Sequence, residues 1–262
     1  MGRARRTVRD VVYAVYTRRL QGRLDSEKMP RHVGVIVDGN RRWARHSEGS
    51  ADGGYRAGYE AGADKISEFL GWCEEAGVEV VTLWLLSTDN LNRESSQLGE
   101  LLAVIEELVE TLAGTGRWRL QPLGALDLLP GHTSEALKEA ATATEHVDGL
   151  TVNVAVGYGG RRELADAVRA LLNEHASQGT TIEELAEILD VEHIAGHLYT
   201  KGQPDPDLVI RTSGEQRLSG FLHWQSAHSE FWFCDALWPD FRRIDFLRAL
   251  RAYAARERRY GV

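Results

Sequence analysis

The sequence predicts an α/β fold: a single domain with a mainly parallel six-stranded sheet flanked by helices. Three observations lead to this prediction. Short apolar runs alternate with segments whose apolar residues recur at helical spacing. The run at 78–86 is apolar almost throughout, as in strands that are covered on both faces. Finally, 262 residues suffice for one well-buried domain, and no repeat or linker divides them.

Six apolar runs are expected to be the strands. They lie at 32–37, 79–86, 119–124, 151–156, 208–211 and 231–234. Between them, apolar stripes at helical spacing predict helices that include 66–73, 98–112 and 164–172. Thr181 and Glu184 have the spacing of a capping box, which predicts the start of another helix.

The overall charge and the cysteines limit the class of protein. A formal net charge of −8 disfavours a general nucleic-acid binder, which needs a basic face, although a single cleft can still be basic. The two cysteines, Cys73 and Cys234, have no zinc spacing and cannot form a disulfide framework. We expect both to be small core residues in a reducing, cytoplasmic setting.

Residues 1–29 are expected to be an N-terminal helical extension in front of a catalytic domain at 30–262. Several arginines precede a short apolar run at 11–16, which has neither the length nor the cleavage site of a signal peptide. No run reaches the ~20 apolar residues that span a bilayer. Two interpretations remain. A helix packed on the domain or on a partner is favoured, and the alternative is an amphipathic helix in peripheral contact with the inner face of the cell membrane.

Polar loops that contain glycine or arginine follow four of the predicted strands. They begin at Asp38, Ser87, Gly157 and Arg211. In open parallel sheets, ligands bind at the carboxyl ends of the strands, so these loops are expected to converge on one site. The loop at 157–160 is better explained as a tight turn from strand to helix than as a ligand contact.

The side chains in these loops suit a metal ion and phosphate groups. Asp38 offers the hard oxygen ligand that Mg2+ prefers, and Glu230 is a candidate for a second carboxylate. Guanidinium groups match phosphate oxygens in geometry and charge. The candidates are Arg42, Arg93, Arg211 and Arg217. The fingerprints G-x-G-x-x-G and G-x-x-x-x-G-K-[ST] are absent, so a nucleotide-binding protein loses its main support, and a diphosphate ligand is favoured.

Together these loops resemble the motifs of the cis-prenyltransferase family, the undecaprenyl and short-chain Z-farnesyl diphosphate synthases. The matching stretches are HVGVIVDGNRRWA at 32–44, STDN at 87–90 with Arg93, NVAVGYGGR at 153–161, DLVIRTSGE at 207–215, WQ at 224–225, Glu230, LWPDF at 237–241 and RERRYG at 256–261. They cover nearly the whole chain from residue 30 onward, in order. The closest resemblance is to short-chain Z,E-farnesyl diphosphate synthases of the actinobacterial type.

This resemblance implies an enzyme that condenses isopentenyl diphosphate with an allylic diphosphate, with Mg2+ as cofactor, and forms a new cis double bond. Asp38 would hold Mg2+ and assist the departure of the allylic diphosphate, and Glu230 would be a further metal ligand. The allylic diphosphate would be bound by Gly39, Asn40, Arg41 and Arg42, with Trp43 beside it. The isopentenyl diphosphate would be bound by Arg211, Arg217, Leu218 and Ser219. The substrate site near the new bond would be completed by Ser87, Thr88, Asp89, Asn90 and Arg93.

Asn90 occupies the family position that is often described as the proton acceptor. A neutral amide is a poor base, so we interpret its catalytic role as positioning. A substrate phosphate oxygen or a water molecule is then favoured as the acceptor, and Asp38 is the alternative.

The chain departs from the long-chain members of the family at several positions. Tyr59 stands where they usually have His, Leu91 stands where they usually have Trp, and the segment 47–54 is lengthened. Leu85 stands where many of them have a small residue. If Leu85 projects into the product channel beside the helix at 98–112, it takes volume from the growing chain. We therefore expect a short product made from geranyl diphosphate; the alternative is that Leu85 is ordinary core and product length is set elsewhere.

Two alternatives to a short-chain enzyme are kept, and one class is excluded. A long-chain polyprenyl diphosphate synthase would share these motifs. A non-catalytic partner subunit with this fold should lack Asp38 or the pair of Arg211 and Arg217, and all three are present. The trans-prenyltransferases need an Asp-Asp-x-x-Asp cluster, and this chain has no Asp-Asp pair. The resemblance also implies a homodimer, with the segment 256–261 near its interface.

Overall fold

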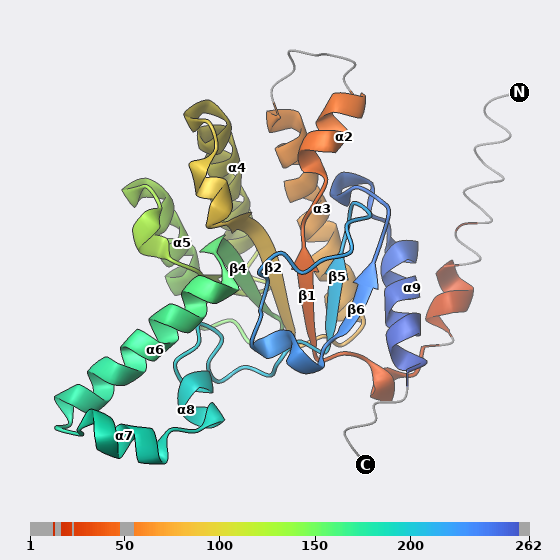
Figure 1. Ribbon diagram of the computed structural model, residues 1–262. Coiled ribbons are helices and arrows are strands. Elements are labelled where there is room, and N and C mark those ends of the chain that lie inside the picture. Colours follow the sequence, from red (N-terminus) through yellow and green to blue (C-terminus); the bar gives the residue numbers. More distant parts are fainter. Residues whose placement is uncertain (1–12, 14–16, 23, 48–54, 257–262) are drawn as a thin grey trace, which may run out of the picture.

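Six parallel strands form one sheet in the order β3-β4-β2-β1-β5-β6 (Figure 1). The strands are β1 (His32–Ile36), β2 (Val80–Ser87), β3 (Arg119–Leu123), β4 (Thr151–Tyr158), β5 (Leu208–Arg211) and β6 (Glu230–Phe233). Every predicted strand is present, and its ends lie within two residues of the predicted ones. The predicted α/β sheet is therefore confirmed.

The computed structural model describes residues 13, 17–22, 24–47 and 55–256. Predictions for the segment 48–54, for 257–261 and for most of the first 16 residues lie outside this part. Within it, the α-helices are α2 (Asn40–Ser47), α3 (Arg56–Glu75), α4 (Ser95–Gly114), α5 (Gly131–Thr144), α6 (Gly160–Ser177), α7 (Ile182–Ile188), α8 (Val191–Ala195) and α9 (Arg243–Ala254). The predicted stripes fall in α3, α4 and α6, and the predicted capping box opens α7.

The main core lies between one face of the sheet and the helices α3, α4, α5 and α9 (Figure 1). Phe69 of α3 meets Trp238, Phe241 and Phe246 edge to face, with ring centroids 5.6, 6.2 and 5.2 Å away. Aromatic pairs of this geometry add to the free energy of burial. They fix the segment after β6 against α3, beside the carboxyl end of β1.

A smaller aromatic cluster covers the other face of the sheet near the carboxyl ends of β2 and β4. Trp84 and Phe221 stack with 5.3 Å between ring centroids, and Tyr158 meets both rings edge to face. Phe221 belongs to the loop between β5 and β6. The cluster therefore holds this loop on the sheet.

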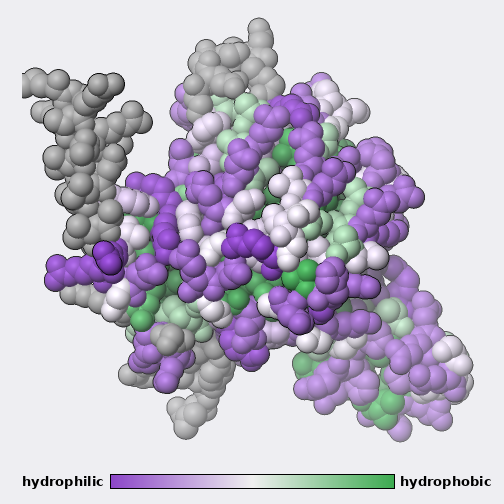
Figure 2. All heavy atoms as spheres, turned by 180° about the vertical axis from the view of Figure 1, so that it is seen from behind, coloured by the Kyte–Doolittle hydropathy of each residue, from purple (hydrophilic) through white to green (hydrophobic). Residues whose placement is uncertain are grey.

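The helices α6, α7 and α8 form an arm that extends from one side of the sheet (Figure 1). Most of the large apolar side chains that are exposed in the described residues lie on it: Val168, Leu172, Ile182, Ile188, Leu189 and Val191. Figure 2 shows hydrophobic patches on this arm. Grouped apolar exposure is typical of an interaction surface.

The described residues of the N-terminal extension pack on the domain. Leu20 is buried in the main core, and the Ile244 N–H donates a hydrogen bond of 3.3 Å to the Tyr13 hydroxyl. These contacts place Tyr13 and Leu20 against the domain, and both the role of the extension and its separation at residue 29 stay predictions. In the described part of the chain, no helix combines the length and apolar character needed to cross a membrane.

A buried polar network lies at the amino ends of the central strands. His32 Nδ1 is 2.7 Å from the Pro204 carbonyl oxygen, and His32 Nε2 is 2.8 Å from the Thr82 hydroxyl. A carbonyl only accepts, so Nδ1 carries the proton and Nε2 accepts from Thr82. Asn153 donates to the same hydroxyl at 2.9 Å. Burial lowers the pKa of His32 from 6.5 to about 4.

This network predicts a loss of stability in mild acid. Between pH 6.5 and about 4, the unfolded chain binds a proton at His32 that the folded chain does not. The free energy of unfolding should therefore fall by about 3 kcal/mol as the pH drops through this window. Urea unfolding at pH 7 and pH 4.5 would measure it. In His32→Gln, which cannot titrate there, the fall should be smaller; an equal fall in both proteins would contradict the assignment.

Candidate active site

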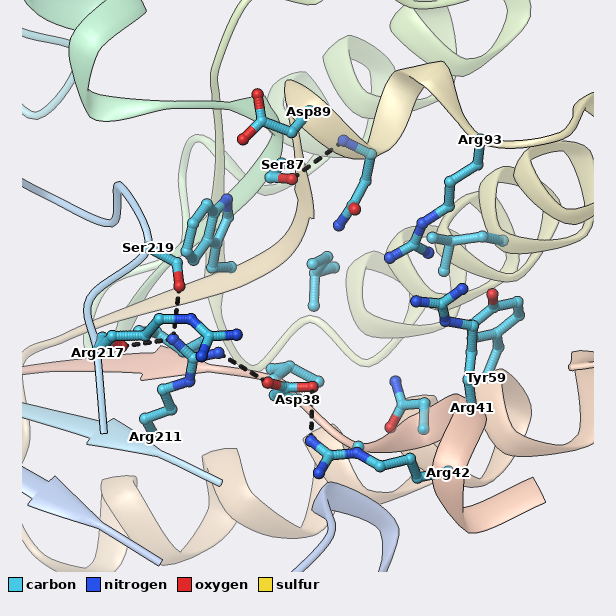
Figure 3. Close-up of a pocket in the computed structure, with 18 of the residues that line it drawn as sticks. Asp38, Arg41, Arg42, Tyr59, Ser87, Asp89, Arg93, Arg211, Arg217 and Ser219 are labelled. Carbon is cyan, nitrogen blue, oxygen red and sulfur yellow. Dashed lines mark hydrogen bonds and ion pairs between the residues drawn. The ribbon is translucent and has the colours of Figure 1, made fainter. Parts of the chain in front are cut away.

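A cavity of about 450 Å³ opens at the carboxyl ends of β1, β2 and β5 (Figure 3). Most of the predicted site residues line it: Asp38, Gly39, Asn40, Arg41, Arg42, Leu85, Ser87, Asp89, Asn90, Arg93, Arg211, Arg217 and Ser219. The loops that follow three strands therefore meet at one place, although they are far apart in the sequence.

Asp38 lies in the turn between β1 and α2. Gly39 makes this turn with a φ of +113°, and an added Cβ would lie 2.9 Å from the Leu237 side chain, so glycine is required. The Asp38 carbonyl accepts hydrogen bonds from the Thr212 hydroxyl at 2.7 Å and from the Trp238 N–H at 3.1 Å. Contacts from the residue after β5 and from the segment after β6 thus fix the backbone that carries this carboxylate.

Two arginines hold the Asp38 carboxylate (Figure 3). Arg211 Nη2 donates to Asp38 Oδ2 at 2.9 Å, and Arg42 Nη2 lies 3.5 Å from Oδ1. Burial raises the pKa of Asp38, but the hydrogen bond from Arg211 and the charges of both arginines outweigh burial, so the pKa lies below its usual value. Asp38 is therefore ionised at neutral pH.

Arg211 organises one side of the cavity. It is 5% exposed, and its Nη1 donates to the Ser219 hydroxyl at 2.7 Å and to the Arg217 carbonyl. Its Nε is buried and has no hydrogen-bond partner among the described residues. Ser213, Ser219 and Leu222 in the same loop have positive φ, which is uncommon for residues with a side chain. Strained backbone of this kind is concentrated at functional loops.

A second cationic group lies on the opposite side of Asp38 (Figure 3). Arg41 belongs to the first turn of α2, and Arg93 follows the 3₁₀ helix η2 (Asp89–Asn92). Burial lowers the pKa of Arg93, and the charge of Arg41 lowers it further. Like charges held near a helix N-terminus favour the binding of an anion.

Arg45 and Tyr59 also line this side, and neither was predicted to belong to the site. Arg45 lies one helical turn after Arg41, so the helical period would have identified it if α2 had been predicted. The Arg41 and Arg45 guanidinium groups lie 5.6 and 5.4 Å from the centroid of the Tyr55 ring. Burial raises the pKa of Tyr59, so its hydroxyl stays neutral and can donate.

Leu85 lines the cavity together with Leu101 of α4. The pairing of β2 with β4 is irregular here: Trp84 pairs with Ala155 and Leu86 with the next residue, Val156. Leu85 is thus the extra residue of a β-bulge. Leu85 therefore lies in the cavity wall beside α4, and its effect on product length stays a prediction.

Three of the predicted substrate contacts do not line this cavity. Thr88 lines an adjoining cavity of about 400 Å³ on the other side of Ser87 and Asp89. The Trp43 indole instead donates to Asp240 at 3.0 Å, and Leu218 packs against the smaller aromatic cluster.

The prediction that Glu230 joins Asp38 at one metal is wrong for a single chain. Glu230 is the first residue of β6 and pairs with Leu208, which pairs with Val33. Asp38 comes five residues after Val33, so the Cα atoms of Asp38 and Glu230 are offset by roughly 16 Å along the strands. The Glu230 carboxylate contacts Arg256 instead.

Comparison with known proteins identifies the family. The family model described as "Putative undecaprenyl diphosphate synthase" matches residues 36–261. The chain belongs to this family of prenyltransferases. The prenyltransferase is 63% identical to a (2Z,6E)-farnesyl diphosphate synthase of Thermobifida fusca over 250 residues, which is 95% of this chain and 97% of that one. It is 58% identical to isoprenyl transferase 1 of Streptomyces avermitilis, over 98% of both chains.

A solved structure is also similar to this prenyltransferase. Lavandulyl diphosphate synthase from Lavandula x intermedia, in complex with dimethylallyl diphosphate, superposes with a TM-score of 0.82 and 30% identity. The similarity covers 90% of this chain and all of that one. The resemblance to cis-prenyltransferases is thus confirmed in sequence and in fold, and this chain is an isoprenyl transferase.

Proposed function

We propose that this prenyltransferase condenses isopentenyl diphosphate with an allylic diphosphate, geranyl diphosphate in the first place, and releases diphosphate. The observation that carries the proposal is the arrangement of two cationic groups on either side of Asp38. Arg211 and Arg217 with Ser219 form one, and Arg41 and Arg93 belong to the other (Figure 3). Two phosphate-binding groups in one cavity suit a reaction between two diphosphates.

The two substrates are assigned to the two groups as the family motifs imply. The allylic diphosphate would bind at the N-terminus of α2, with Arg41, Arg42 and Arg93. The isopentenyl diphosphate would bind at Arg211, Arg217 and Ser219. A bond then forms between C4 of the isopentenyl unit and C1 of the allyl unit, while the bond from C1 to the diphosphate oxygen breaks. Arginines that already face the leaving group stabilise its charge without reorganising, which is the main source of rate enhancement in such sites.

Asp38 fits a divalent cation, and we propose Mg2+. It is ionised, faces the cavity and offers hard oxygen ligands. In the described part of the chain, no group of three or more His, Cys, Asp or Glu side chains could hold a metal ion. Mg2+ commonly takes most of its ligands from water and substrate phosphate, and one carboxylate is then enough. Bound there, it would withdraw negative charge from the departing diphosphate.

The proton that leaves C2 of the isopentenyl unit needs an acceptor. Asn90 lines the cavity, and its backbone N–H donates to the Ser87 hydroxyl at 3.2 Å, which fixes the start of η2. A neutral amide does not take a proton at neutral pH, so Asn90 positions the substrate and a phosphate oxygen or water accepts the proton.

We further propose a short product, (2Z,6E)-farnesyl diphosphate. Leu85 and Leu101 narrow the apolar side of the cavity, and relatives of more than 50% identity are named (2Z,6E)-farnesyl or short-chain Z-isoprenyl diphosphate synthases. The alternative is a long-chain polyprenyl product.

One assay separates these functions. Purified protein with Mg2+, radiolabelled isopentenyl diphosphate and a panel of allylic diphosphates should give a fifteen-carbon product from geranyl diphosphate, and little further growth. Products with many added units would support the long-chain alternative. Absence of any product with every allylic diphosphate would contradict the proposed reaction.

We also propose a cytoplasmic homodimer. The exposed apolar side chains of the α6–α8 arm support self-association, and both cysteines are unpaired, as in a reducing compartment. Sedimentation velocity would test the dimer, because a mass near that of one chain, 29.2 kDa, would contradict it.

A further inference from the structure

Glu163 is a buried carboxylate that the proposed chemistry does not use. It lies in the first turn of α6 and is 1% exposed. Its Oε2 accepts a hydrogen bond of 2.5 Å from the Tyr158 hydroxyl. Its Oε1 accepts from the Tyr199 N–H at 2.9 Å and from Gln225 Nε2 at 3.0 Å. All three donors are neutral groups.

An ionised carboxylate in this environment lowers the stability of the fold. Burial raises the pKa of Glu163, and the hydrogen bonds from Tyr158, Gln225 and Tyr199 offset only part of that effect. A buried charge without a cationic partner does not favour stability, and an apolar side chain of similar volume would pack at lower cost. Glu163 is distinctive because its hydrogen bonds join three separate segments of the chain.

Glu163 and its helix hold the loop that carries Ser219 at two points. At the first, the Gly160 N–H donates to the Gly220 carbonyl at 2.8 Å. An added Cβ at Gly160 would lie 2.9 Å from that carbonyl, so the close approach requires glycine. At the second, Glu163 binds Gln225, which opens the 3₁₀ helix η4 (Gln225–His228).

The segment between these two points is the strained part of the loop. Gly220 and Leu222 have φ values of 98° and 46°, and Ser219 directly before them has 51°. A non-glycine residue keeps such a conformation only when its surroundings enforce it. The Ser219 hydroxyl in turn receives the hydrogen bond from Arg211. Phe221 and Leu222, which lie between the two points, are fully buried and also hold the loop. Loss of the hydrogen bond between Glu163 and Gln225 would therefore loosen one of several contacts that keep Ser219 and Arg217 at the cavity.

We propose that Glu163 is a positioning residue for the isopentenyl diphosphate half of the site: it holds the loop of Arg217 and Ser219 in the binding conformation. The inference rests on the proposed assignment of that substrate to Arg211, Arg217 and Ser219. The allylic half should not depend on Glu163. Arg41 and Arg42 are carried by α2 and Arg93 by the end of η2, and Glu163 bonds to neither segment.

The test compares three variants, two at Glu163 and one at its hydrogen-bond partner Tyr158. Glu163→Leu keeps the volume and removes all three acceptors. Glu163→Gln keeps two of the three contacts, because its carbonyl can accept from Tyr199 and Gln225, and it reverses the third, because its amide can donate to the Tyr158 oxygen. Tyr158→Phe removes one donor and keeps the aromatic packing. Glu183→Leu, the same substitution at an exposed position of α7, is the matched control. For each protein, KM for both substrates, kcat and the thermal midpoint are measured.

We expect Glu163→Leu to raise KM for isopentenyl diphosphate about tenfold, which corresponds to about 1.4 kcal/mol of binding free energy, because the loop would lose buried hydrogen bonds. KM for the allylic substrate should stay within about twofold, and Glu163→Gln should restore most of the affinity. If Glu163→Leu does not fold, Tyr158→Phe should show the same split between the two KM values in weaker form.

Two results would overturn the inference. One is a folded Glu163→Leu, or in its place Tyr158→Phe, with unchanged KM for isopentenyl diphosphate. The other is an equal rise of both KM values, which would indicate general loosening of the domain. Arg217→Ala tests the proposed function separately. It should raise KM for isopentenyl diphosphate whatever Glu163 does, and failure to do so would overturn the substrate assignment itself.

Discussion

Replacing Asp38 with alanine is expected to lower kcat about 10³-fold. The change removes a carboxylate that two arginines hold in the cavity, and with it the proposed ligand for Mg2+. Loss of a preorganised group that stabilises charge in the transition state usually costs two to three orders of magnitude. Steady-state assays at saturating Mg2+ and substrates measure the effect.

A second substitution at the same position separates chemistry from stability. Asp38→Asn keeps the size of the side chain and an oxygen that can accept from Arg211. Its thermal midpoint should therefore lie closer to that of the wild type than the midpoint of Asp38→Ala does. Its kcat should still fall about as far as that of Asp38→Ala, because an amide oxygen carries no charge. Asp148→Ala, an exposed carboxylate outside the cavity, is the control. A folded Asp38→Ala enzyme within about tenfold of the wild type would refute the proposed role.

Replacing Leu85 with alanine is expected to lengthen the product by at least one isoprene unit. Leu85 and Leu101 narrow the cavity on its apolar side, and interiors are packed too closely to accept extra carbon atoms without removing others. Chromatography of the radiolabelled product measures the distribution of chain lengths.

Leu83→Ala is the matched control for this experiment. Leu83 is fully buried in the main core two residues earlier on β2, so its loss should destabilise the fold by about 2–5 kcal/mol and leave product length unchanged. An unchanged product from Leu85→Ala would show that Leu85 is ordinary core and that product length is set elsewhere.

The sequence predicted those features that depend on local pattern and on the rule for parallel sheets. The six strands were found because the apolar runs are short and continuous. Asp38 and Arg211 were placed together because both lie at the carboxyl end of a strand, and the carboxyl ends of parallel strands share an edge. The helices α2, α5, α8 and α9 were not predicted. In α2 the arginines obscure the apolar stripe, and in α9 the apolar stripe was not separated from the preceding aromatic segment.

Predictions of site residues failed where the role depends on which end of a strand the residue occupies. Glu230 was assigned to the metal because it stands in a family motif, but it begins β6 and therefore lies at the amino end of the sheet. Tyr59 was noted only as a departure from the family, and nothing in its helical context showed that it would reach the cavity. The hydrogen-bonding partners of Glu163 come from three separate segments, and no spacing along the chain predicts them.

The bulge at Leu85 has a consequence for how enzymes of this kind diverge. Leu83 and Leu86 both face the main core, and their pairing partners on β4 fix the register of the sheet. Leu85 stands outside that register, because the partner strand offers it no residue of its own. Selection can therefore exchange this one side chain for a smaller or larger one while every rung of the ladder stays intact. Substitutions at this position can in this way change the length of the product without destabilising the fold.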